Sequence, residues 1–131
     1  MLSEEREPIH ECVDSAILAD LRQLDISCDL LSTLITLFLE DVPTRLVTLQ
    51  NALQQGDAGA LVRAAHSVNG SSGNLGAWRM RQLCIEIEAC GKAKDLTRIG
   101  DLLAQLASEF ELVRQRLMVE HATLARNTLA D

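Results

Sequence analysis

His66 stands beside glycines in a stretch that otherwise has the spacing of a helix. Gly70 and Gly73 follow it by four and seven residues, so all three would share one side of that helix. Each glycine costs about 1 kcal/mol relative to alanine in a helix, yet Val68 and Leu75 keep the spacing of a buried face. Glycines let a partner's backbone come close, and a neutral imidazole is a good nucleophile near pH 7. The pattern therefore indicates a histidine on a surface kept almost free of side chains.

A helical wheel locates this histidine relative to the predicted core. The core direction lies roughly 120° from His66, and it is set by Leu61, Ala65, Val68 and Ser72. The imidazole is thus expected at the edge of the exposed face, on the same side as Asn69. A plainer interpretation remains open: a solvated histidine followed by glycines that only end a helix.

Other residues that could do chemistry form no comparable group. A di-metal bundle needs paired Glu-x-x-His motifs on facing helices, and only Glu7 and His10 have that spacing, in an arm that contains proline. We therefore expect no metal site, and we expect His10 and His121 to be solvated. The cysteines lack a C-x-x-C pair, which favours buried free thiols; they are Cys12, Cys28, Cys84 and Cys90.

Composition excludes several functional classes. The chain has 131 residues, which fits one domain, and its 12 basic and 19 acidic residues give a net charge of −7. Net acidity and only 2% aromatic residues argue against nucleic-acid binding. No apolar run is long enough to span a membrane, and the N-terminus lacks the apolar core of a signal peptide. We expect a cytoplasmic protein.

Hydrophobic periodicity predicts an all-α fold, an antiparallel up-and-down four-helix bundle with a short extra N-terminal helix. The expected helices cover about 14–24, 29–55, 58–73, 77–91 and a last segment that follows Asp95. Asp14, Asp57 and Asp95 are the expected N-caps. We expect a flexible arm over 1–13, the bundle domain over 14–120 and a frayed helix end over 121–131.

The second of these helices contains a proline. Its apolar phase continues through Pro43, which favours one long helix bent at that residue. The alternative is a helix stop in which Asp41 caps a new helix with Pro43 at its first position.

The stretch AAHSVNGSSGNLGA, residues 64–77, resembles the signature of histidine-containing phosphotransfer (HPt) domains. That signature reads His-x-hydrophobic-Lys-Gly-small-small-x-x-hydrophobic-Gly. Residues 34–57 resemble the family's preceding kinked helix, and similar downstream spacings are found for Leu83, Cys84, Glu88, Gly91 and Asp95. The resemblance covers roughly 14–117 and implies a four-helix bundle, in agreement with the periodicity.

The resemblance implies a phosphorelay intermediate. His66 would accept a phosphoryl group from the aspartyl phosphate of a response-regulator receiver domain and pass it to another receiver. Gly70, Ser71 and Gly73 would form the docking surface, and a hybrid sensor histidine kinase would be a further partner. The receiver would supply the aspartate and Mg²⁺. The chain itself would then be a monomer without a cofactor, and not an enzyme.

One position departs from the family pattern. Asn69 stands where the family has lysine; its amide can donate a hydrogen bond to phosphoryl oxygens but carries no charge, so we expect it to hold them more weakly. Lys92 or Arg63 could compensate, although a solvated surface arginine is the plainer interpretation of Arg63. Glu88 would hydrogen-bond the His66 ring and fix its tautomer, unless it is simply an exposed acid. Asn69 also motivates an alternative function, a non-phosphorylated adaptor that binds a receiver or kinase without relaying phosphate.

Overall fold

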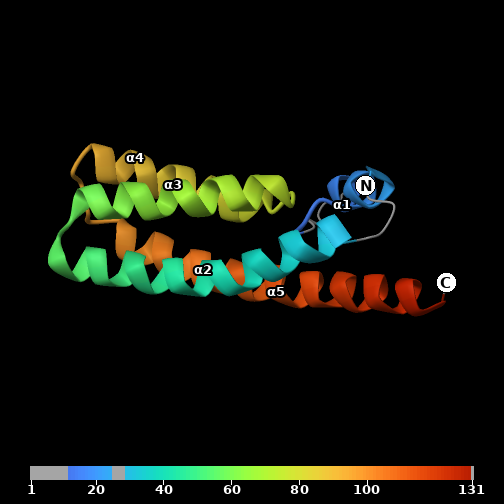
Figure 1. Cartoon of the computed structure of the whole chain (residues 1–131). Coiled ribbons are helices and arrows are strands. Elements are labelled where there is room, and N and C mark those ends of the chain that lie inside the picture. The colour runs from blue at the N-terminus through green and yellow to red at the C-terminus, as the bar shows by residue number, and fades with distance from the viewer. Residues whose placement is uncertain (1–11, 25–28, 131) are drawn as a thin grey trace, which may run out of the picture.

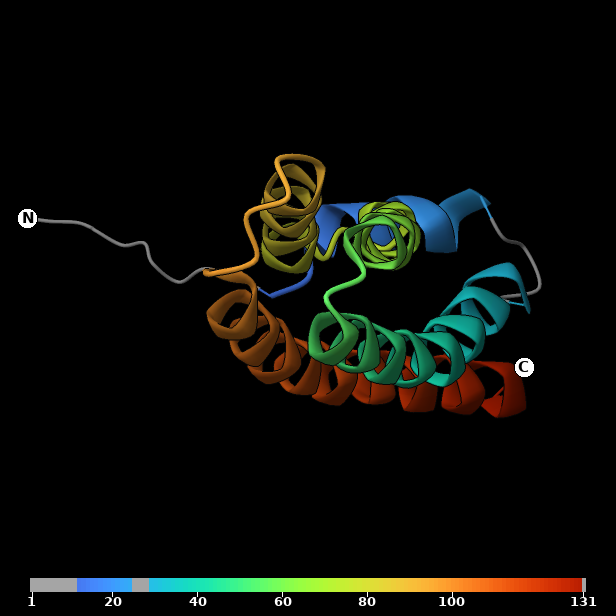
Figure 2. The ribbon, with the colours of Figure 1, turned by 90° about the vertical axis from the view of Figure 1, so that its left-hand side faces the viewer.

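The computed structural model describes residues 12–24 and 29–130, and this part of the chain is all-helical. The helices are α1 (Ser15–Leu24), α2 (Asp29–Gln55), α3 (Ala58–Asn74), α4 (Trp78–Lys92) and α5 (Ile99–Ala130). Figure 1 shows α2 to α5 running alternately in opposite directions, with α1 at one end of the molecule. The view in Figure 2 shows α3 and α4 as one layer over α2 and α5. The predicted fold class is confirmed.

Capping chemistry explains the boundary between α2 and α3, but not the start of α5. Gly56 ends α2 with a φ of +68°, and Asp57 Oδ1 accepts from the Ala60 N–H at 3.0 Å. Asp95 does not cap α5, contrary to expectation. Its carboxylate instead accepts from the backbone N–H and the hydroxyl of Thr97 at 3.2 and 2.8 Å. The helix therefore begins only after this turn.

The long second helix is continuous. α2 includes Pro43 within a single helical run, so the predicted single helix is confirmed and the alternative stop at Asp41 is wrong. Proline removes one backbone donor from the ladder, and Figure 1 shows the N-terminal part of α2 turned toward α1. None of the helices in the described ranges is long and apolar enough to cross a membrane.

Polar contacts at two places, Asp14 and Arg22, connect α1 to the bundle. The Asp14 N–H donates to the Gly76 carbonyl at 2.9 Å, and the Trp78 indole donates to Asp14 Oδ2 at 3.1 Å. At the other side, the buried Glu120 lies 3.0 Å from Arg22 Nη1 and 3.3 Å from Arg116 Nη1. The extra helix is thus fastened both to the turn between α3 and α4 and to α5.

The end of the last helix carries a buried side chain and a polar contact with α2. α5 continues past Glu120 to Ala130, and Leu124 is buried. His121 Nε2 lies 3.1 Å from the Ser32 hydroxyl on α2, so the expectation of a solvated His121 is wrong. Residues 1–11 of the predicted arm over 1–13, which include His10, lie outside the described residues, and so does Cys28. Val13, assigned to the arm, is buried in the core.

The core is packed mainly by leucine and alanine. The predicted inner stripe of α3 is buried, as shown for Leu61, Ala65, Val68 and Ser72. The two phenylalanines, Phe38 and Phe110, meet with ring centroids 5.9 Å apart. Cys84 is a buried free thiol, while Cys12 and Cys90 are free and half-buried.

Close packing of α3 on α4 depends on Gly91. A Cβ there would lie 2.7 Å from Val62 Cγ2 and 3.4 Å from the Ala58 carbonyl oxygen. Valine is stiff at χ1, so Gly91→Ala should lower the free energy of unfolding by about 1–2 kcal/mol, although alanine favours helix. Chemical denaturation measures this. Gly100→Ala is the control, because its Cβ would make only an ordinary 3.8 Å contact with Leu53; equal stability of both variants would contradict the account.

Candidate functional site

His66 is presented to solvent from the middle of α3. Its side chain is 77% exposed, and its Nδ1 lies 3.2 Å from Glu88 Oε1 on α4. An ionised carboxylate only accepts hydrogen bonds, so this contact places the ring proton on Nδ1. Nε2 then keeps its lone pair and is the nitrogen available as a nucleophile.

Glu88 is a buried carboxylate that serves two donors. The residue is only 8% exposed, and Oε2 accepts from Asn69 Nδ2 at 3.1 Å while Oε1 faces His66. A buried charge is tolerated only where it is hydrogen-bonded, which these two contacts provide. Glu88 is therefore not the exposed acid of the plainer interpretation. Burial and the nearby Glu88 raise the pKa of the Cys84 thiol to about 12, so this cysteine is an uncharged part of the core.

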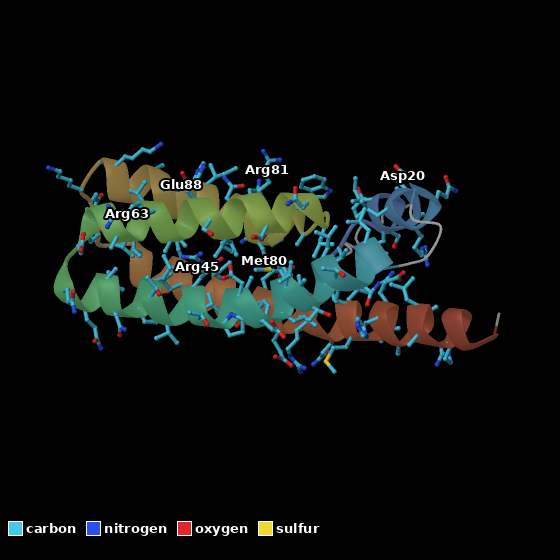
Figure 3. All side chains as sticks on the ribbon, in the orientation of Figure 1. Asp20, Arg45, Arg63, Met80, Arg81 and Glu88 are labelled. Atoms are coloured by element: carbon cyan, nitrogen blue, oxygen red, sulfur yellow. The ribbon has the colours of Figure 1, made fainter. Side chains whose placement is uncertain are left out.

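Asn69 connects Glu88 to a residue that the sequence did not single out. Arg81 Nε donates to Asn69 Oδ1 at 3.1 Å, and the guanidinium lies 5.7 Å from the centroid of the Trp78 ring. The side chains of His66, Glu88, Asn69 and Arg81 thus form one hydrogen-bonded chain across α3 and α4. Figure 3 shows Glu88 and Arg81 along the same edge of this helix pair.

The two predicted compensating cations stand apart from this chain. Arg63 is exposed, and its Nη1 would be 3.2 Å from a Cβ on Gly59, so the side chain turns back toward the start of α3. Figure 3 places Arg63 nearer the turn between α2 and α3 than Glu88 is. Lys92 is exposed one turn beyond Glu88. Within the described residues neither forms a hydrogen bond or ion pair with the cluster.

The glycines beside His66 differ in their surroundings. Gly70 is exposed, and a Cβ there would meet nothing within 4 Å, whereas a Cβ on Gly73 would lie 3.7 Å from Arg81 Cδ. Ser71 is half-buried, and its hydroxyl donates to the Ser67 carbonyl at 3.2 Å. Gly76 has a structural role: its φ is +74°, and a Cβ would lie 2.9 Å from that of Asp14.

A shallow groove adjoins this surface between α2 and α3. Its volume is about 310 Å³, and it is lined by Leu34, Leu37, Phe38, Asp41, Ser71, Asn74 and Leu75. Within the described ranges no group of three or more His, Cys, Asp or Glu side chains could hold a metal ion. The site thus offers an exposed, oriented imidazole beside open backbone, which suits a nucleophile that another macromolecule must reach.

Comparison with known proteins agrees with this geometry. The model of the Hpt domain family matches residues 33–116. The chain belongs to the Hpt domain family. The matched range contains α3 and α4 completely, and therefore every side chain of the hydrogen-bonded chain around His66.

Two proteins show how far this Hpt domain resembles known ones. The chain is 29% identical over 98 residues to histidine-containing phosphotransfer protein 2 of Arabidopsis thaliana, covering 72% of this chain and 63% of that protein's length. The crystal structure of histidine-containing phosphotransfer protein B (HptB) from Pseudomonas aeruginosa PAO1 is 34% identical. It superposes with a TM-score of 0.80 and covers 86% of this chain and 96% of its own.

Arg81 is the site residue that sequence reasoning missed. It lies outside the signature stretch of the Hpt domain, and arginines on exposed helix faces are common. The signal that could have found it is antiparallel register. If Glu88 faces His66, the residue seven positions before Glu88 must face the residue seven positions after His66. These are Arg81 and Gly73, and a Cβ on Gly73 would indeed contact the Arg81 side chain.

Proposed function

We propose that this Hpt domain is a phosphorelay intermediate that carries a phosphoryl group on Nε2 of His66. The observation that carries the proposal is the exposed imidazole whose Nδ1 faces a buried carboxylate at 3.2 Å. Membership of the Hpt domain family and the likeness to phosphotransfer proteins support it.

The proposed reaction is a direct transfer between two proteins. The Nε2 lone pair bonds to phosphorus, the bond from phosphorus to the aspartyl oxygen of a receiver breaks, and the aspartate leaves as a carboxylate. Such transfers depend on in-line positioning and charge stabilisation. Glu88 compensates the positive charge that the ring gains as the P–N bond forms. The receiver supplies the aspartate and Mg²⁺, so this chain acts as a substrate and carrier.

The proposed partners are receiver domains and a hybrid sensor histidine kinase, which dock on Gly70, Ser71 and Gly73. Gly70 offers open space for a partner's backbone. The chain acts as a cytoplasmic monomer in this proposal, with no nucleic acid or membrane as partner.

A transfer assay tests the proposal. A panel of purified receiver domains carrying radiolabelled aspartyl phosphate is incubated with the chain and with its His66→Gln variant. We expect at least one receiver to label the parent chain and none to label the variant. If no receiver transfers label, or if His66→Gln is labelled equally, the assignment to His66 is wrong.

Asn69 favours one alternative, an adaptor that binds a receiver or kinase without relaying phosphate. The amide carries no charge to hold the phosphoryl group. The same assay separates the two functions, because an adaptor would bind receivers yet remain unlabelled.

A further inference from the structure

The amide of Asn69 does not replace the missing lysine, because both of its polar atoms have other partners. Nδ2 donates to Glu88 and Oδ1 accepts from Arg81, each at 3.1 Å. Since a carboxylate only accepts and a guanidinium only donates, these partners fix the orientation of the amide. Asn69 therefore acts as a connector between two charged side chains.

Arg81, on the neighbouring helix α4, brings a positive charge close to residue 69, where the family has lysine. Its Nε is hydrogen-bonded to the Asn69 side chain, so the guanidinium stands level with a residue that is about 4.5 Å from His66 along the helix axis. Within the described residues only Nε has a hydrogen-bond partner. The N–H groups of Nη1 and Nη2 remain available, and such a fork matches phosphoryl oxygens.

The surroundings of Arg81 hold the guanidinium, and the backbone one turn after His66 is open. The cation lies over the Trp78 ring, and its stem passes the bare backbone of Gly73. Gly70, one turn after the imidazole on the same helix, has nothing within 4 Å of its Cβ position. A phosphoryl group on Nε2 would therefore have open space beside Gly70 and a cation, Arg81, on the neighbouring helix.

Charge balance favours a cation beside the phosphoryl group. A phosphoryl group brings about −1.5 to −2 charges near pH 7, and here they would arrive beside the buried Glu88 in a chain of net charge −7. We propose that Arg81 is the phosphoryl-binding cation of this domain, holding the oxygens on phosphorylated His66. This proposal rests on the proposed function.

Phosphoramidate tests the role of Arg81 without any receiver. Nε2 attacks its phosphorus, the P–N bond to the departing nitrogen breaks, and that nitrogen takes up a proton and leaves as ammonia. We expect Arg81→Gln to be phosphorylated about tenfold more slowly than the parent chain, as for a lost hydrogen bond to a charged group. Phosphorus NMR follows the phosphohistidine.

Arg79→Gln is the matched control, because it removes the same charge from the same helix. Arg79 Nη2 donates to Gln105 on α5 at 3.0 Å, away from the cluster, so its variant should react at the parent rate. Asn69→Lys should restore most of the rate in the Arg81→Gln background and change little in the parent chain, where the cation is present. A purely structural role of Arg81 would not be rescued by a charge at residue 69.

The outcomes separate this proposal from the proposed function. If the parent chain reacts at His66 and Arg81→Gln is equally fast, Arg81 is not the phosphoryl-binding cation while the relay function stands. If the parent chain is not phosphorylated, or if His66→Gln gives the same signal, the relay function itself fails. A slow Arg81→Gln variant that Asn69→Lys does not rescue also overturns the proposal.

Discussion

Replacing Gly70 with glutamine should lower phosphoryl transfer from a receiver at least a hundredfold while raising the melting temperature. The two effects have separate causes. A Cβ at this position would meet no side chain or neighbouring helix within 4 Å, and glutamine is favoured over glycine in a helix by roughly 0.5–1 kcal/mol. The same side chain would occupy the space in which a docked backbone lies. A small misplacement of the reacting atoms can cost a hundredfold in rate.

Thermal denaturation and the receiver assay together measure both effects. Gly100→Gln is the control, because Gly100 is also exposed in a helix and its Cβ position makes only an ordinary contact. That variant should transfer at the parent rate. Phosphoramidate should still label Gly70→Gln, since the small donor needs no docking surface. Normal transfer from a receiver to the folded variant would show that partners dock on another face.

Periodicity predicted the helices well because burial of an apolar stripe determines them. The phase that persists through Pro43 identified α2 as one helix, and the stripe from Leu61 to Ser72 placed His66 on an exposed edge. Periodicity could not predict what the end of α5 contacts. The contact between His121 and Ser32 joins residues 89 positions apart. The local spacing of apolar residues cannot predict such a contact.

Only part of the site could be predicted, because some of its contacts also join residues that are far apart in the sequence. His66 stood out by residue type and by its place in the signature, and Glu88 by its spacing downstream of the signature. Arg81 is one of several exposed arginines, and it joins the hydrogen-bonded chain only through the side chains that α3 and α4 bring next to it. Asp95 failed as a predicted cap in the same way, because the hydroxyl and N–H of Thr97 take up its carboxylate. Which nearby polar group binds the carboxylate therefore decides whether an aspartate caps a helix.

Glu88→Gln should slow phosphorylation of His66 by phosphoramidate roughly ten- to hundredfold, although it changes only one atom. The hydrogen-bonded chain has a direction: Arg81 can only donate, so Asn69 presents its oxygen to Arg81 and its N–H to residue 88. A carboxylate accepts from both Asn69 and His66. Glutamine has a single oxygen, and Asn69 would take it.

The amide N–H of such a glutamine would then face Nδ1 of His66. Nδ1 would have to accept, which moves the ring proton to Nε2 and removes the lone pair that attacks phosphorus. If the glutamine turns its oxygen to His66 instead, two N–H groups meet at a buried site, at a cost of about 1–3 kcal/mol. Nitrogen NMR of the imidazole reports the tautomer directly. Glu86→Gln is the matched control, since Glu86 pairs with Arg98, away from the cluster.

A second substitution distinguishes hydrogen-bond direction from charge as the cause. Asn69→Ala removes the donor that faces residue 88, so in the Glu88→Gln background the glutamine can turn its oxygen to Nδ1 without conflict. We expect the double variant to recover the Nδ1–H tautomer and to be phosphorylated faster than Glu88→Gln alone, but below the parent rate because Arg81 loses its partner on Asn69. If it stays as slow as Glu88→Gln alone, the negative charge of Glu88 matters more than the direction of its hydrogen bonds. If Glu88→Gln is as fast as the parent chain, the carboxylate does not orient the ring, and the geometry around Nδ1 has no role in phosphoryl transfer.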